Sequence, residues 1–401
     1  MGLKRSLADS ARSLYRFGFV RSALLLAGPA RWKLPPVLRW RIESEAAVRR
    51  RHRRSAVEYG YPERVVPTEV PSPSPTFGHR IVARPYRVSA PFVAQLERVW
   101  LVGPNATPVT TEGRVLLSPY RNEPRMLTLE AHPELEQFVR TRAYERPWPA
   151  DSIHEPLHSM VGRLDVNYAH WLLESCAQLE GVEAWADRSG RRPRLLVRSE
   201  GPAFHRSSLA RLGYSDGALD WPVSPPPLAV DALVVASLPG TPVACSPRSI
   251  AWLRSRLLGG ENQPAEARRP SVEATRLYIA RPPGGWRYVE NGVEVEGALE
   301  GRGFTVVAPE RFAFDEQVEL FRRAQVVVAQ HGAGLTNMLF APDDGVLVEL
   351  TGGYGDGLFC SLANAVGQRY RALAGEGDGD GMFVDLGALM DVLDEVIGRA
   401  P

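Results

Sequence analysis

Cysteine is scarce in this sequence, and the few that occur form no recognisable pattern. The 401 residues include only Cys176, Cys245 and Cys360. Their number is odd, their spacing is wide and no C-x-x-C pair occurs, which argues against a disulfide framework and against a cysteine zinc site. Free cysteines suit a reducing compartment best. We therefore expect a cytoplasmic protein.

Long apolar runs are also absent. The most apolar stretch near the start, residues 17–30, carries Arg21 in its middle and is too short and too interrupted to span a bilayer. No convincing signal-peptide cleavage site follows it, whereas an interfacial amphipathic helix stays open as an alternative. The sequence has no internal repeat and no coiled-coil or collagen-like composition. What is left is an ordinary globular chain, whose length predicts two domains.

The net charge is small but unevenly distributed. Lys and Arg (48) nearly balance Asp and Glu (46), so nucleic acid is not expected as a partner. Residues 1–54, however, hold fourteen basic and only three acidic residues. Such an arm is either a solvated tail or a segment that contacts anionic membrane, peripherally, on the inner face of the plasma membrane. Lysine occurs only at Lys4 and Lys33, and this preference for arginine indicates a GC-rich, bacterial genome.

Composition and periodicity divide the chain into three parts. Residues 1–75 are predicted to form a basic tail and a Pro/Ser-rich connector, residues 76–258 a first domain and residues 259–401 a second. The first domain begins with a predicted β-hairpin over 98–117 and a helix over 165–186. It continues with strands at 194–197 and 232–236 and helices at 204–212 and 247–258.

Strands and helices alternate even more clearly in the second domain. Alternation of this kind predicts a parallel sheet covered on both faces, and two such units side by side leave a cleft for a ligand. The fold class is therefore α/β with two Rossmann-like domains facing a cleft. The predicted strands are 277–279, 304–307, 325–329 and 346–350, and the predicted helices are 293–300, 315–323, 358–368 and 386–397.

The strongest local pattern is HGAGLTN at residues 331–337, directly after a buried strand. Ligands of doubly wound sheets bind in the loops that follow the strands, and glycines let a phosphate approach the backbone. Thr336 and Asn337 add hydrogen-bond donors, and His331 can donate to a phosphate oxygen. The alternative is a tight turn around a buried, hydrogen-bonded histidine.

A second candidate site begins the helix predicted over 165–186. His170 and Glu174 are four residues apart and share one helix face. A carboxylate beside an imidazole is a suitable general-base pair for deprotonating a hydroxyl. Spacing alone equally fits an ordinary surface ion pair.

Two other motifs carry less weight. Residues 213–217 spell G-x-S-x-G, the nucleophile elbow of esterases, but a helix rather than a strand precedes the serine and the HGAG segment follows it instead of preceding it. Asp378 and Asp380 spell D-x-D, a motif with which one class of glycosyltransferases binds a metal ion and a diphosphate. They lie in a glycine-rich stretch with no apolar strand ahead of it, which indicates a surface turn. No metal site is predicted.

Taken together, the motifs resemble glycosyltransferase family 61, which includes capsular and exopolysaccharide enzymes. The resemblance covers roughly residues 95–370 and is specific only as a combination. One departure is Glu290-Asn291, where the family often has Asn-Glu. The matching segments are NYAHWLLE at 167–174, the basic region 276–295, GF at 303–304, FDEQ at 314–317, Ala324, HGAGLTN at 331–337 and Glu349.

The resemblance implies a GT-B-like architecture and an inverting transfer of a sugar from a nucleotide-sugar donor to a hydroxyl of a glycan or glycolipid, without metal or cofactor. It places Glu174 or His170 as the base. A different class stays open: a non-catalytic nucleotide-sugar or glycan-binding subunit of a polysaccharide assembly complex. The implied donor-binding residues are Arg281, Arg287, His331, Gly332, Ala333, Gly334, Thr336, Asn337 and Glu349.

We predict that turnover survives EDTA, because arginine, histidine and backbone N–H groups can neutralise a diphosphate in place of Mg²⁺. The double variant Asp378→Ala, Asp380→Ala is expected to keep nearly full activity in the same assay. Loss of turnover on chelation, with recovery on adding Mn²⁺ or Mg²⁺, would contradict the prediction.

Overall fold

The computed structural model describes most of the chain from Ile42 onward. Residues 1–41, which include most of the basic arm, lie outside the described residues, as do the D-x-D pair and most of the predicted linker. In the part that is described, no helix is long and apolar enough to cross a membrane. The described residues are 42–43, 45–53, 55–67, 85–116, 132–238, 240–241, 244–259, 274–281, 287–352, 357–377 and 381–397.

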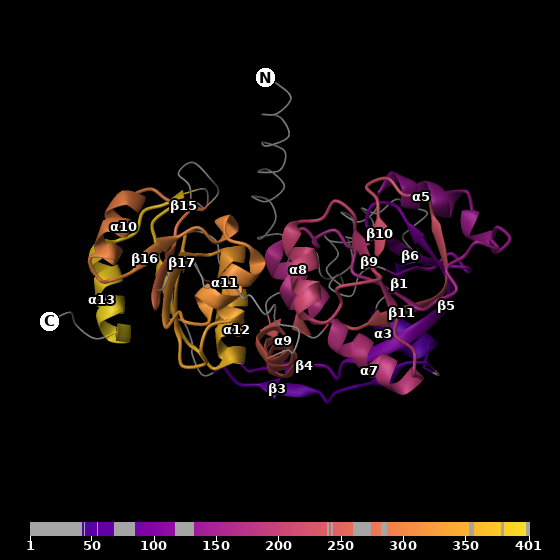
Figure 1. Cartoon of the computed structure of the whole chain (residues 1–401), viewed down its shortest axis with the longest axis horizontal. Helices are drawn as coiled ribbons and strands as arrows, with labels where there is room; N and C mark the ends of the chain where they lie inside the picture. Colours follow the sequence, from indigo (N-terminus) through magenta and orange to yellow (C-terminus); the bar gives the residue numbers. More distant parts are fainter. Residues whose placement is uncertain are drawn as a thin grey trace, which may run out of the picture.

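The chain folds into two lobes. In Figure 1 the first lobe is drawn in purple and magenta and the second lobe in orange and yellow. The second lobe is built on a parallel sheet in the order β16-β14-β17-β18-β19. Its central strands are continuous apolar runs because helices cover both faces, as in β17, VVVAQ, which is buried throughout. The predicted strands of this lobe are confirmed. Its strands are β14 (Arg276–Ile279), β16 (Thr305–Val307), β17 (Val326–Gln330), β18 (Val346–Thr351) and β19 (Arg369–Ala374).

The helices predicted for the second lobe are confirmed, with shorter ends for two of them. An additional two-stranded sheet, β15 (Tyr288–Val289) with β20 (Gly381–Met382), lies beside them. The HGAGLTN segment forms only a short 3₁₀ helix, η6 (Ala333–Leu339). The remaining helices are α10 (Gly292–Glu300), η5 (Pro309–Arg311), α11 (Phe314–Phe321), α12 (Leu358–Val366) and α13 (Leu386–Ile397).

The first lobe differs from the parallel sheet that was predicted. The hairpin is confirmed as β5 and β6, but β5 also pairs antiparallel with β11 over most of its length, so the sheet is mixed. Beyond β11 the strands β8, β9 and β10 are parallel, and β1 pairs parallel with β7 at the other edge of the sheet. The strands are β1 (Ile42–Glu43), β2 (Val57–Glu58), β5 (Phe92–Val102), β6 (Thr107–Thr110), β7 (Val115–Leu116), β8 (Leu157–Ser159), β9 (Arg194–Arg198), β10 (Leu219–Trp221) and β11 (Leu228–Ala236).

The helix predicted over 165–186 is confirmed as helical but is broken into three pieces. Asn167 caps the first by accepting hydrogen bonds from the N–H groups of Ala169 and His170. One turn of π-helix, η4, then separates α6 from α7. The helices of this lobe are α3 (Glu45–Arg51), α5 (Pro133–Arg140), η3 (Ala143–Glu145), α6 (Tyr168–His170), η4 (Trp171–Cys176), α7 (Leu179–Ser189) and α8 (Ala203–Arg211).

The end of the predicted basic tail takes part in the first lobe. Strand β1 pairs with β7, and Val48 on α3 is buried in the core beside Phe92 and Leu116. Arg50 and Arg51 of the same helix are exposed, and the half-exposed Arg49 has its guanidinium over the Phe92 ring. Residues 42–51 therefore belong to the first lobe, although they lie ahead of the predicted boundary at residue 76.

The two lobes share one continuous hydrophobic core. Helix α9 (Pro247–Gly259) lies between them and packs against α7, α8 and α12, as Figure 1 shows. The hairpin of β3 (Glu63–Val65) and β4 (Tyr86–Val88) runs beneath α9, where the Tyr86 hydroxyl lies 3.1 Å from Ser361 Oγ of α12. A small hairpin of β12 (Gly240–Thr241) and β13 (Ala244–Cys245) precedes α9.

Polar contacts across the lobe boundary join residues of the sequence motifs. The hydroxyl of Tyr168 donates to Asn337 Oδ1 at 2.7 Å, and Asn337 Nδ2 donates to Gln317 Oε1 at 3.0 Å. Burial raises the pKa of Tyr168 well above its usual value, so the phenol stays a neutral donor. A second contact, between Arg211 and Asp315, joins α8 to α11 at 2.7 Å. The lobes are therefore held in one relative orientation by buried side chains.

We predict that Tyr168→Phe lowers the free energy of unfolding in urea by about 1–2 kcal/mol, because it leaves the buried Asn337 oxygen without its donor. Tyr214→Phe serves as the matched control, since its hydroxyl contacts Glu183, at 3.5 Å, and Arg192, both inside the first lobe. Equal destabilisation by both variants would show that the hydrogen bond between the lobes contributes nothing.

Candidate functional site

The histidine of the HGAGLTN segment is held by a buried carboxylate. His331 follows β17, and Glu349 lies on the adjacent parallel strand β18. Nδ1 of His331 pairs with one oxygen of Glu349, while the Tyr370 hydroxyl of β19 donates to the other at 2.6 Å. All three side chains are buried. Glu349 therefore orients the imidazole, and protein groups occupy both of its oxygens.

Two arginines converge on the backbone of this loop. Arg281 Nη2 and Arg287 Nη1 each donate to the carbonyl oxygen of His331, at 3.3 Å. The guanidinium of Arg281 lies so close to Gly332 that a Cβ there would meet Nη2 at 1.6 Å, so a larger residue would displace this guanidinium. Burial, and then the nearby charge of Arg287, lower the pKa of Arg281. Such mutual repulsion would be relieved by a bound anion.

Arg287 is also held in an unusual backbone conformation. Its φ of 58° lies in the left-handed region, which costs a non-glycine residue free energy. Strain of this kind clusters at ligand sites, where surrounding structure maintains it. The charge of Arg287 is thereby brought toward His331 by the chain itself.

The other members of the predicted donor set lie in two different environments. Ala333 and Gly334 are partly exposed at the start of η6. Thr336 and Asn337 are completely buried, and Asn337 is occupied by Tyr168, Gln317 and the Gly334 carbonyl. The structure thus brings Arg281, Arg287, His331 and Gly332 together, with Glu349 behind them, and places Thr336 and Asn337 in the interior.

The predicted base pair occupies the π-helical turn of the first lobe. His170 Nδ1 lies 2.8 Å from Glu174 Oε1, which is the i,i+4 contact expected from their spacing. Glu174 is buried, and its other oxygen, Oε2, has no hydrogen-bond partner among the described residues. Single π-turns inside helices are frequent at functional sites. The pair is therefore more than a surface ion pair, because one carboxylate oxygen stays buried and unsatisfied.

Asp165, another carboxylate upstream of this pair, has a different environment. Its oxygens accept from Arg198 at 3.0–3.2 Å and from the N–H of Gly162 at 3.2 Å. The side chain is almost entirely buried. Its contacts stabilise the loop before α6.

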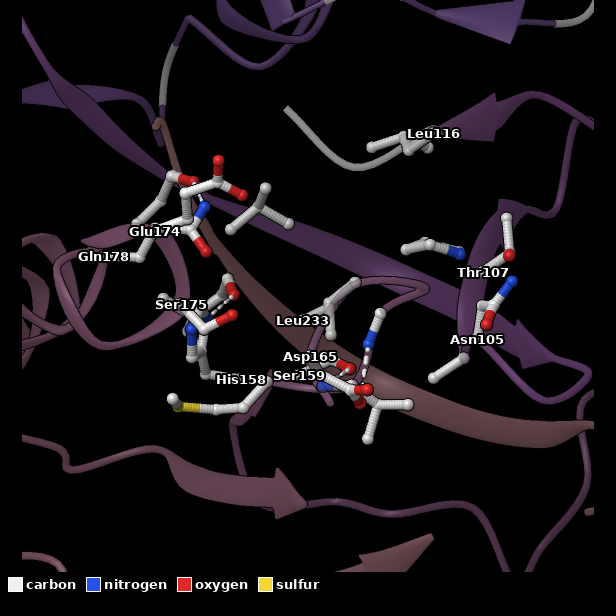
Figure 2. Close-up of a pocket in the computed structure, with 18 of the residues that line it drawn as sticks. Asn105, Thr107, Leu116, His158, Ser159, Asp165, Glu174, Ser175, Gln178 and Leu233 are labelled. Atoms are coloured by element: carbon white, nitrogen blue, oxygen red, sulfur yellow. Dashed lines mark hydrogen bonds between the residues drawn. The ribbon is translucent and has the colours of Figure 1, made fainter. Parts of the chain in front are cut away.

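Two pockets meet at the base pair. The larger, about 980 Å³ including its open mouth, lies in the first lobe and is shown in Figure 2. The smaller, about 400 Å³, is lined by His170 and Glu174 on one side and by Leu358 of α12 on the other. Because Phe359, the next residue of α12, has its ring 5.1 Å from that of His331, the first turn of α12 links the base pair to the arginine cluster.

The sequence interpretation missed His158, which lines the larger pocket. Its Nδ1 bonds to the carbonyl of Val234 at 2.9 Å, and Nε2 is buried without a partner in the described part of the molecule. Burial lowers its pKa to about 4. A lone histidine in the short segment 157–159 carries no periodic or motif signal that could have identified it.

Residues 168–348, somewhat less than half of the chain, match the family model described as Glycosyltransferase 61. The match begins at Tyr168 and includes the base pair, both arginines and His331. It supports the resemblance to glycosyltransferase family 61 and indicates a glycosyltransferase. No curated protein matches the chain. Among the described residues, no group of three or more His, Cys, Asp or Glu side chains is placed to hold a metal ion.

Proposed function

We propose that the protein is an inverting glycosyltransferase that moves a sugar from a nucleotide-sugar donor to a hydroxyl acceptor in bacterial surface polysaccharide synthesis. The observation that carries this proposal is the convergence of Arg281 and Arg287 on the glycine loop after β17, at the carboxyl edge of a parallel sheet. Ligands of such sheets bind at that edge. The GT-B-like arrangement, a cytoplasmic or peripheral membrane location and independence from metal belong to the same proposal.

The donor diphosphate lies against the arginine cluster in this proposal. Two guanidinium groups present planar sets of N–H donors, which suit bidentate contact with phosphate oxygens. Gly332 lets the backbone and Arg281 approach together, and Glu349 keeps the His331 ring in one orientation. These groups stabilise the negative charge that develops as the nucleoside diphosphate leaves.

The acceptor hydroxyl lies at Glu174 in this proposal. In a single displacement, its oxygen bonds to C1 of the sugar while the bond between C1 and the phosphate oxygen breaks. The hydroxyl proton passes to Glu174 Oε2, the oxygen that the protein leaves unsatisfied, while His170 holds Oε1. The base then stands on the first lobe and the departing phosphate on the second, which matches attack from the face opposite the leaving group.

We predict that Arg281→Gln weakens the binding of a nucleoside diphosphate about tenfold to a hundredfold, because a charged hydrogen bond is lost from a buried site. Uridine and guanosine diphosphates, titrated in parallel by calorimetry, test this. Arg322→Gln is the control, since that arginine is paired with Glu319 on the surface of the same lobe. Unchanged affinity in Arg281→Gln, or equal loss in both variants, would remove the donor assignment.

We also predict that Glu174→Gln lowers kcat by about 10²–10⁴-fold, the usual contribution of a general base, with donor affinity unchanged. His170→Ala should act through the same step. The kcat of the double variant is therefore expected to be no lower than that of the less active single variant. Glu183→Gln, on α7 and outside both pockets, is the control.

Turnover can be followed before the acceptor is known as slow hydrolysis of a nucleotide sugar, found by a thermal-shift screen. A binding subunit without catalytic activity would show the shift but no hydrolysis. Wild-type kcat in both Glu174→Gln and His170→Ala would place the base elsewhere.

A further inference from the structure

Two residues that line one pocket each carry a buried polar atom without a partner in the described structure. Of the buried side-chain nitrogen and oxygen atoms that lack a hydrogen bond in the described structure, only His158 Nε2 and Glu174 Oε2 belong to residues lining the 980 Å³ pocket. Their residues are 3% and 7% exposed. An unsatisfied buried polar atom costs free energy, and native proteins keep few of them. A ligand in this pocket would lie against both residues.

The tautomer of His158 determines what it can offer that ligand. Nδ1 faces the Val234 carbonyl, which can only accept, so Nδ1 carries the proton and Nε2 presents its lone pair. With its pKa near 4, the ring stays neutral at physiological pH. His158 is therefore an acceptor for an O–H or N–H group, independent of pH in the neutral range.

The remaining wall of the pocket is largely apolar. Phe92 of β5, Leu233 of β11, Val48 of α3, Leu116 and Met160 all contribute. Figure 2 shows Glu174, Ser175 and His158 grouped at one side of the cavity, with Asn105 and Thr107 on the opposite side. Small-molecule pockets commonly combine such apolar walls with a few converging polar groups. A wholly hydrophilic glycan would gain little from these walls.

We propose that this pocket binds the acceptor substrate and that the acceptor is amphipathic: an apolar portion fills the pocket, and a hydroxyl group beside the reacting one donates to His158 Nε2. His158 is then a positioning residue, which takes no proton and orients the hydroxyl that Glu174 deprotonates. The identification of this ligand as the acceptor rests on the proposed transferase function. The binding of an amphipathic hydroxyl compound can nevertheless be measured without any donor.

The pocket can be tested with alkyl glucosides as probes, below their micelle concentrations and without nucleotide. In calorimetric titrations of the full chain, Kd should tighten from methyl to butyl to octyl β-glucoside, by about fourfold for each methylene that enters the pocket. Gly162→Phe should abolish this binding, because Gly162 lines the pocket and a Cβ there meets no atom within 4 Å. Gly297→Phe, equally open but on the surface of α10, is the matched control.

Affinity that does not depend on alkyl length, or equal binding by Gly162→Phe and wild type, would overturn the apolar part of the proposal. Loss of glucoside binding in Gly297→Phe as well would show that the binding does not depend on the pocket, and would also overturn the proposal. Titrating the same variants with nucleoside diphosphate separates the proposed donor site from the proposed acceptor pocket. Failure of wild type to bind nucleotide refutes the donor site, whereas failure to bind alkyl glucosides refutes only the pocket.

The role of His158 is tested by His158→Asn. The Asn amide N–H can still donate to the Val234 carbonyl, so the fold should persist. The substitution removes the acceptor Nε2. We expect octyl glucoside to bind roughly tenfold more weakly, and the KM for an acceptor to rise while kcat and nucleotide affinity change little. The loss should be the same at pH 6 and pH 8, because the ring is neutral at both.

His132→Asn, at the start of α5 and outside the pocket, is the control, since Asn is itself a good helix cap. Wild-type affinity for octyl glucoside in His158→Asn would overturn the positioning role. So would a loss of nucleotide affinity as large as the loss of glucoside affinity, since that would indicate a general structural defect.

Discussion

The hydrogen bond between Tyr168 and Asn337 is the contact on which the arrangement of the site depends. It joins the residue two positions before His170 to the end of the loop that begins at His331, across the boundary between the lobes. Asn337 extends it to Gln317 on α11. Asn337 is fully buried and Tyr168 is half-buried, so loss of this contact would leave the Asn337 oxygen without its donor. Three sequence motifs therefore meet in one buried network whose function is to hold two half-sites together.

The charges of the two half-sites are segregated by this arrangement. The second lobe gathers cations, with Arg281 and Arg287 aimed at one carbonyl, whereas the first lobe presents a carboxylate and an imidazole. A transfer reaction needs this separation, since negative charge grows on the leaving phosphate while a proton leaves the acceptor. Helix α12 stands between them, with Leu358 at the base pair and Phe359 on His331. Its first turn thus connects the His170–Glu174 pair to the arginine cluster.

Much of this could be predicted from local patterns, and the exceptions share a physical cause. Apolar runs and helical periods located four of the five strands of the parallel sheet, all but β19, and the helices α10 to α13 of the second lobe, because each is determined by a few consecutive residues. The antiparallel pairing of β5 with β11 was missed, since it joins segments about 130 residues apart and periodicity does not report strand direction. The register of β17 and β18 likewise decides that Glu349 meets His331, and no motif encodes that register.

The environments of the buried polar groups separate those that stabilise the fold from those available to a substrate. Glu349, Asp165 and Asn337 resemble functional residues in sequence, yet each has its polar atoms engaged by protein partners. Glu174 and His158 each have one atom engaged and a second left unsatisfied on a pocket wall. Folding fixes the position of such a side chain through its first contact and leaves the second atom without a protein partner. A sequence motif marks Asn337 and Glu174 alike, because it records residue type and spacing but not how many contacts the folded chain has already made.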